Sequence, residues 1–159
     1  MPKSPYLKEG RLADVIAAIT AMANYRFYKL SFERAAEKIT NRPEHSTKWA
    51  ELFKEHPEFF RISHNSVSLV WRRQNPKLFD TKIDREITRE EFSALSVEYK
   101  AKRISRRPLR PEETTALIDV AIRLHERAIE DQRAKLWWVP ILSAFLAFIG
   151  AMCGVFFAS

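Results

Sequence analysis

The C-terminal segment constrains this chain more than any other feature, because residues 136–158 contain no charged side chain. As a helix with a rise of ~1.5 Å per residue, the segment would cover roughly 30 Å or more, about the thickness of the hydrocarbon core of a bilayer. Trp137 and Trp138 stand where the apolar run begins, at the headgroup level that tryptophan rings favour. The sequence therefore predicts a tail anchor with a transmembrane helix over residues 137–158.

The distribution of charge predicts how such a chain is oriented. Every charged residue precedes the apolar tail, so the positive-inside tendency places residues 1–136 in the cytoplasm of a single-pass protein, at the inner membrane if the source is bacterial. The polar stretch Met1–Tyr6 is unlike a signal peptide, and the tail is expected to serve as both targeting signal and anchor. Cys153, the one cysteine, falls within the tail, which excludes an intramolecular disulfide and a cysteine metal site.

Apolar periodicity predicts a small domain over residues 1–78. A helix is expected over residues 11–24, a short strand near residue 28, a helix capped by Ser31, and a helix that ends before Pro57. Alternation then predicts two strands joined as a hairpin. The residues expected to share one core are Trp49, Phe53, Phe60, Leu69 and Trp71.

The order helix, strand, helix, helix, hairpin resembles a winged helix-turn-helix domain over residues 10–73. The resemblance implies a small α+β fold, mainly helical, that binds DNA in many proteins and other proteins in many more. Lys48 and Lys54 on the third helix are interleaved with Glu51 and Glu55, and acids facing phosphates are repelled. The hairpin is more permissive for nucleic acid, through Arg61, His64, Asn65, Arg72 and Arg73.

Residues 79–110 predict a basic helical extension. Thr88 and Glu91 form a capping-box pattern, and Ser96 is placed to cap a further helix. Residues 72–110 carry about +6 of the formal net charge of +7. A basic cluster stands out within this region, with the members Lys100, Lys102, Arg103, Arg106, Arg107 and Arg110. Three interpretations are open: the cluster is a solvated face, it contacts anionic lipid headgroups, or it contacts nucleic-acid phosphates.

Residues 111–136 predict an amphipathic stalk helix that leads to the membrane. Pro111 and two following acids suit its first turn. Ile118, Ile122, His125 and Ile129 follow the spacing of a coiled-coil seam, which favours homo-oligomerisation through stalk and tail. In the alternative, this face packs back on the extension of the same chain.

Small residues of the tail gather on one face of a helical wheel, where no large side chain enters. Such a face permits close packing of helices in lipid, with a second copy or with another membrane protein. Chance clustering is the alternative, since small residues are common in membrane helices. The residues predicted for packing are Ser143, Ala147, Gly150, Ala151, Gly154 and Ala158.

No catalytic pattern accompanies these features. The four histidines, His45, His56, His64 and His125, are scattered, and the chain has only three glycines and no phosphate-binding loop. The sequence predicts no enzyme, no cofactor and no metal. It predicts a tail-anchored protein whose cytosolic domain binds a protein partner as an adaptor or assembly subunit. The alternatives are a membrane-tethered nucleic-acid-binding protein and a subunit of a membrane effector whose catalytic partner is another chain.

Overall fold

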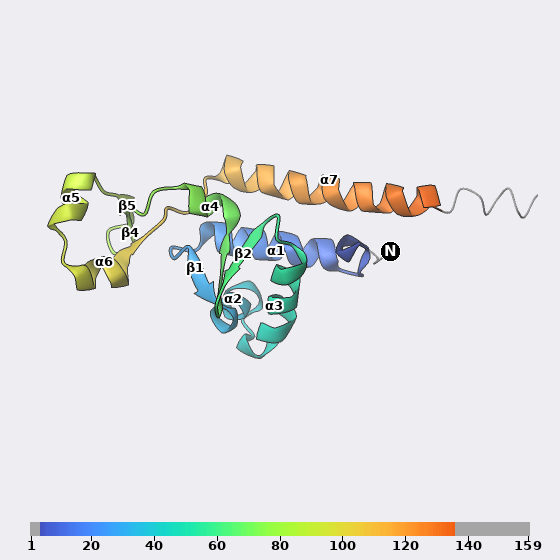
Figure 1. Cartoon of the computed structure of the whole chain (residues 1–159), viewed down its shortest axis with the longest axis horizontal. Helices are drawn as coiled ribbons and strands as arrows, with labels where there is room; N and C mark the ends of the chain where they lie inside the picture. Colours follow the sequence, from blue (N-terminus) through green and yellow to red (C-terminus); the bar gives the residue numbers. More distant parts are fainter. Residues whose placement is uncertain (1–3, 136–159) are drawn as a thin grey trace, which may run out of the picture.

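The computed structural model describes residues 4–135, which form a mainly helical α+β structure with two small sheets (Figure 1). The helical elements are η1 (Pro5–Leu7), α1 (Arg11–Asn24), α2 (Phe32–Thr40), η2 (Pro43–His45), α3 (Ser46–Glu55), α4 (Val70–Gln74), α5 (Arg89–Ala94), α6 (Val97–Arg103) and α7 (Pro111–Lys135). The strands are β1 (Lys29–Ser31), β2 (Phe60–Ser63), β3 (Ser66–Leu69), β4 (Phe79–Asp80), β5 (Arg85–Glu86) and β6 (Ile104–Ser105).

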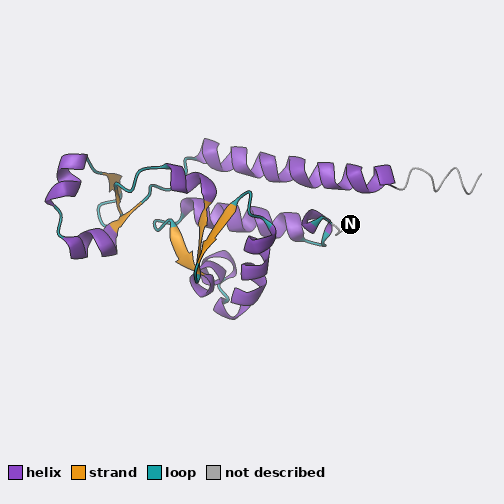
Figure 2. Ribbon diagram, in the orientation of Figure 1, coloured by secondary structure: helices purple, strands orange, loops and turns teal. Residues whose placement is uncertain are grey.

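The first sheet is antiparallel with the strand order β1-β3-β2, and it lies beside α1, α2 and α3 (Figure 2). Val67 in the central strand pairs with Leu30 on one side and with Ile62 on the other. The predicted order of helix, strand, helix, helix and hairpin is confirmed over these residues.

Local signals in the sequence account for the ends of α2 and α3. The Ser31 hydroxyl accepts a hydrogen bond from the Arg34 amide at 3.3 Å, as expected of a helix N-cap. Asn41 ends α2 in the left-handed conformation, with φ 57°, which asparagine tolerates better than most residues. His56 ends α3 directly before Pro57, as predicted.

An aromatic cluster between α3 and the first sheet forms the centre of the core. Trp49, Phe53, Phe59 and Phe60 are each at most 2% exposed, and the Phe53 and Phe60 rings lie 4.9 Å apart. The prediction that Trp49, Phe53, Phe60 and Leu69 are buried is therefore confirmed.

The prediction for Trp71 was wrong. Strand β3 ends at Leu69 and the chain turns at once into α4, so the side-chain period changes from two residues to 3.6. This change points Arg72 into the interior and leaves Trp71 38% exposed.

Residues 75–110 form a lobe beside the first domain, which we call the basic lobe. The predicted helices α5 and α6 are present, with a complete capping box at Thr88 and Glu91 and a Ser96 cap. The lobe also contains a small sheet that the sequence did not predict, in which β4 pairs with both β5 and β6. Each of these strands has two residues, too few to leave a period in the sequence.

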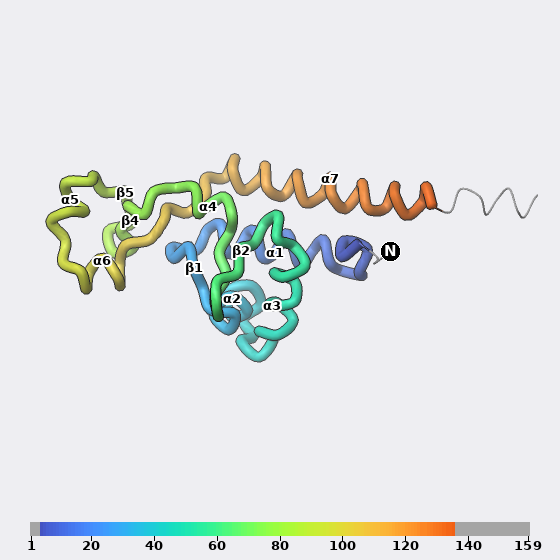
Figure 3. The backbone as a smooth tube through the Cα atoms, viewed as in Figure 1, coloured from blue at the N-terminus to red at the C-terminus, as the bar shows by residue number. Residues whose placement is uncertain are grey.

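Helix α7 lies antiparallel to α1 and is packed against it (Figures 1 and 3). Leu117, Ala121 and Ala128 are buried there, and Ile118 and Leu124 also contact the core. Residues 111–129 are thus not a free stalk, and they pack on α1 instead of the extension because α1 supplies the complementary apolar stripe. Residues 130–135 are exposed.

Within residues 4–135, no helix combines the length and the apolar character that crossing a bilayer requires. The predicted transmembrane helix lies outside the described residues. So do Trp137 and Trp138 and the predicted packing positions Ser143, Ala147, Gly150, Ala151, Gly154 and Ala158.

Candidate functional site

The guanidinium of Arg72 is fully buried where α1, α4 and the basic lobe meet. It donates hydrogen bonds to carbonyl oxygens from two segments, and no carboxylate of the described chain contacts it. From the end of α1 and the loop after it, the acceptors are Met22 at 2.8 Å, Tyr25 at 2.5 Å, Arg26 at 3.5 Å and Phe27 at 3.3 Å. From the basic lobe they are Arg106 at 2.6 Å and Arg107 at 3.0 Å.

These acceptors explain how the molecule holds an arginine in its interior. Carbonyl groups at the C-terminus of α1 lack helical partners and carry partial negative charge, so a cation is favourable there. Burial and the nearby Arg107 lower the pKa of Arg72 to about 10. This value is still well above 7, and the side chain therefore stays charged at neutral pH. Arg72 is a structural tie, and because it is buried it is not available for the nucleic-acid contact that the hairpin sequence permitted.

The predicted basic cluster is divided between helix α6 and the segment that joins β6 to α7. Lys100, Lys102 and Arg103 are on α6, Arg106 and Arg107 follow β6, and Arg110 precedes α7.

Arg106 and Arg107 make contacts within the protein. The Arg106 guanidinium donates to the carbonyl oxygens of Arg73 and Asn75 and lies 5.2 Å from the centre of the Tyr28 ring. Arg107 donates two hydrogen bonds to the Glu113 carboxylate, at 2.6 and 2.7 Å. These two arginines fix the lobe to the domain and to α7, and they are poorly placed for an outside ligand.

The Arg107–Glu113 pair predicts a pH-dependent contribution to stability. The Arg107 hydrogen bonds lower the pKa of Glu113 from 4.5 to about 2. A lowered folded-state pKa stabilises the fold above the unfolded value, and this stabilisation is lost as the pH falls from about 4.5 to about 2. We expect Glu113→Gln to cost about 1 kcal/mol at pH 7 and to remove part of the acid dependence of unfolding, measured by urea denaturation at pH 7, 4 and 3. Equal acid dependence in both proteins would contradict the assignment.

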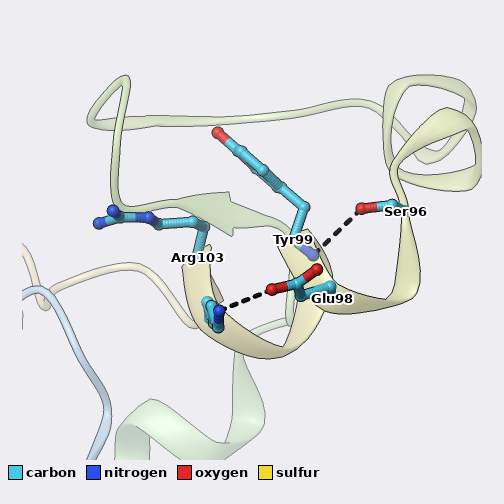
Figure 4. A pocket seen from close by; sticks show the side chains of 5 residues that line it. Ser96, Glu98, Tyr99 and Arg103 are labelled. Atoms are coloured by element: carbon cyan, nitrogen blue, oxygen red, sulfur yellow. Dashed lines mark hydrogen bonds and ion pairs between the residues drawn. The ribbon is translucent and has the colours of Figure 1, made fainter.

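Helix α6 borders a shallow, open hollow of about 180 Å³, lined by Ser96, Glu98, Tyr99, Lys102 and Arg103 (Figure 4). Lys102 pairs with Glu98 at 2.7 Å, and the Tyr99 hydroxyl donates to the Asp80 carboxylate at 3.0 Å. The Arg103 side chain has no hydrogen-bonded or ion-pair partner among residues 4–135. An open hollow with one unengaged guanidinium suits an anionic group of a larger partner better than an enclosed small molecule.

The outer surface of the basic lobe combines unpaired cations with apolar side chains. Val97 on α6 is 84% exposed and Ile83 is 50% exposed. Arg103 and Arg106 form no salt bridge in the part of the chain that the structure describes. Five further cations of the lobe also form none there: Lys77, Lys82, Arg89, Lys100 and Arg110.

The face that a nucleic-acid-binding domain would use is different. Lys48 on α3 is paired with Asp14 at 2.9 Å, and Glu51 is exposed on the same helix. Because Ser63 pairs with Ser66, the hairpin turn consists of His64 and Asn65 alone. A mixed helix face and a two-residue turn offer few free cations to phosphates.

A cluster of titratable groups holds η1 against α3 and α7. The Tyr6 hydroxyl donates to Glu58 at 2.6 Å, and Nδ1 of His56 lies 3.0 Å from the same carboxylate oxygen. His56 is fully buried and forms the C-cap of α3. His125 on α7 also contacts this cluster, with Nδ1 3.0 Å from the Tyr6 carbonyl oxygen.

Burial of Tyr6 and its hydrogen bond to Glu58 raise the pKa of the tyrosine. Burial of Glu58 acts to raise the pKa of the glutamate, but the hydrogen bonds that Glu58 accepts from His56 and Tyr6 outweigh this effect and lower it. These shifts favour a neutral tyrosine and an ionised glutamate, the protonation states in which the cluster joins η1 to α3. No three His, Cys, Asp or Glu side chains of residues 4–135 come close enough together to hold a metal ion.

Comparisons with known proteins do not assign the chain to a group: no family model matches it, and neither a curated protein nor a solved structure is detectably similar.

Sequence reasoning missed two features of the basic lobe region. The role of Arg72 left no signal, because an arginine at the end of a strand pattern is ordinary on a protein surface. The exposure of Val97 and Ile83 also depends on tertiary structure, although an isolated valine at the first position of a capped helix was visible in the sequence.

Proposed function

We propose that this chain is a single-pass, tail-anchored membrane protein whose cytosolic domain binds a protein partner, as an adaptor or assembly subunit. The observation that carries the proposal is the uncharged run of residues 136–158, which directly follows α7. Because α7 is packed along α1, the domain would be held a few helical turns from the membrane and not on a long tether.

The arrangement of residues 10–73 supports a winged-helix-like domain within this proposal. The order of helices and strands and the sheet order β1-β3-β2 agree with that architecture. The paired Lys48, the acidic Glu51 and the two-residue turn support a protein partner over nucleic acid. Salt-dependent retention of duplex DNA by residues 1–135 would favour the nucleic-acid alternative instead.

Removal of residues 136–159 should move the protein from the membrane fraction to the soluble fraction. The apolar tail is the only segment of the sequence long enough to span, and the rest of the chain has enough charge to remain in solution. Carbonate-washed membranes and immunoblotting of both fractions provide the measurement. A truncated chain that stays with washed membranes would show that another surface anchors it.

Substitution of Gly150 or Gly154 by leucine should weaken association of the tails, because both glycines share the predicted small-residue face. Cys153→Leu, at a position outside the predicted small-residue face, introduces the same leucine and is the matched control. Contacts between membrane helices are individually modest, about 1 kcal/mol, so we expect a shifted monomer–oligomer balance in crosslinking of native membranes. Equal effects of all three variants would leave the tail as a simple anchor.

A further inference from the structure

The basic lobe lies at one end of the molecule, and the chain leaves α7 at the other (Figures 1 and 3). Helix α7 has 25 residues, so its two ends are about 37 Å apart. The elements toward its C-terminal end are η1, the start of α1 and the end of α3. Salt bridges from Lys8 and Arg11 to Glu55 hold these three elements together. If the tail enters a bilayer, this end is nearest to it and the lobe is remote.

Charge is distributed unevenly between these two ends. Residues 75–110 contain ten Lys or Arg and six Asp or Glu. Residues 126–135 of α7 contain three Lys or Arg and three Asp or Glu, and the neighbouring Glu55 is paired with Lys8 and Arg11. The end close to the tail therefore has no marked excess of cations, and the excess of positive charge lies in the lobe, away from that end.

Helices α5 and α6 contain no buried residue. Helices of six and seven residues are marginal in water unless tertiary contacts stabilise them. On α6, Val97 is 84% exposed and Ala101, one turn later, is also exposed. Lys100 borders this apolar strip on one side, and Glu98, which is paired with Lys102, borders it on the other. Arg103 lies beyond Lys100 on the face that lines the hollow, and neither Lys100 nor Arg103 forms a salt bridge among residues 4–135. The helix thus has the composition of one side of an interface, with an apolar centre and a charged rim.

We propose that α6 docks an acidic protein at the end of the molecule remote from the membrane. Charge complementarity specifies the acidic character, because the unpaired side chains of the lobe are predominantly cationic. A protein fits better than a nucleic acid because an apolar side chain of a protein can pack on the exposed Val97, whereas phosphates gain nothing from it. The docking surface deepens the proposed function, and only its remoteness from the bilayer rests on the tail anchor.

Photo-crosslinking of the full-length chain in the cells that encode it tests this surface. Benzoylphenylalanine replaces Val97, and Val120 on α7, which is 41% exposed, is the matched control position. We expect a discrete protein adduct from position 97 and not from position 120, with a captured polypeptide of acidic isoelectric point. Arg103→Glu should reduce the adduct about fivefold or more, whereas Lys54→Glu on α3 should leave it unchanged.

A lipid adduct, a nucleic-acid adduct, a protein adduct insensitive to Arg103→Glu, or no adduct at position 97 would each overturn the proposal. Circular dichroism of the purified Arg103→Glu protein checks that the lobe remains folded. Membrane fractionation of the same cells tests the anchor separately, so a soluble chain that still gives the charge-dependent adduct would refute the anchor and keep the docking surface.

Discussion

Replacement of Arg72 by methionine should destabilise the chain ending at Lys135 by about 3–5 kcal/mol. The six carbonyl groups that accept hydrogen bonds from Arg72 come from the α1 end and from the basic lobe, and methionine satisfies none of them. A buried acceptor left without a donor costs about 1–3 kcal/mol, and several would be exposed together. Urea denaturation followed by circular dichroism measures the change.

Arg73→Met is the matched control for this substitution. Arg73 is the next residue of α4, its side chain is exposed, and only its backbone carbonyl is engaged, by Arg106. We expect this variant to remain within about 0.5 kcal/mol of the natural chain. Arg72→Lys should recover only part of the loss, because an ammonium group cannot reach carbonyls arranged around a planar guanidinium. A stable Arg72→Met protein would show that the buried tie is dispensable.

Replacement of Phe60 by alanine should cost about 3–5 kcal/mol, because the ring is 1% exposed and lies against both Phe53 and Phe59. The neighbouring rings belong to α3 and to the turn before β2, and they cannot collapse fully into the cavity. For a domain whose total stability is typically about 5–15 kcal/mol, such a loss brings the chain near unfolding. Thermal unfolding of the chain ending at Lys135 measures the effect.

Trp71→Ala tests whether strand β3 ends at Leu69, because Trp71 would be buried if the strand continued. Tryptophan is the larger side chain and follows strand β3, which pairs with the strand that contains Phe60. Because Trp71 is 38% exposed on α4, we expect its loss to cost about 1 kcal/mol or less. If Trp71→Ala were as damaging as Phe60→Ala, strand β3 would have to continue past Leu69, as the sequence pattern alone suggested.

The basic lobe shows how packing alters the meaning of a charge cluster. Six basic side chains between residues 100 and 110 look alike in the sequence, yet Arg107 is committed to Glu113 and Arg106 to carbonyl oxygens. Arg103 on α6 is unengaged within residues 4–135. Charge reversal at Arg103 therefore tests binding, whereas reversal at Arg107 would first test folding.

Local features of the sequence predicted most of the element order. The Ser31 and Ser96 caps, the capping box at Thr88 and the stop at Pro57 depend on neighbouring residues, so they can be recognised without the fold. Helical and alternating periods predicted α1, α2, α3 and the hairpin for the same reason. The candidate docking surface was predicted only as part of a larger basic cluster.

Tertiary structure decided the features that depend on partners distant in the sequence. Arg72 is buried because α1 and the lobe supply carbonyl groups 34 to 50 residues away, and no local pattern reports that arrangement. The apolar stripe of α7 was equally suited to a partner helix, to the extension or to α1, and only packing selects among them. The positions of apolar and charged residues along the chain follow from the sequence alone. Which of them remain exposed depends on the fold, because burial is a property of contacts between segments.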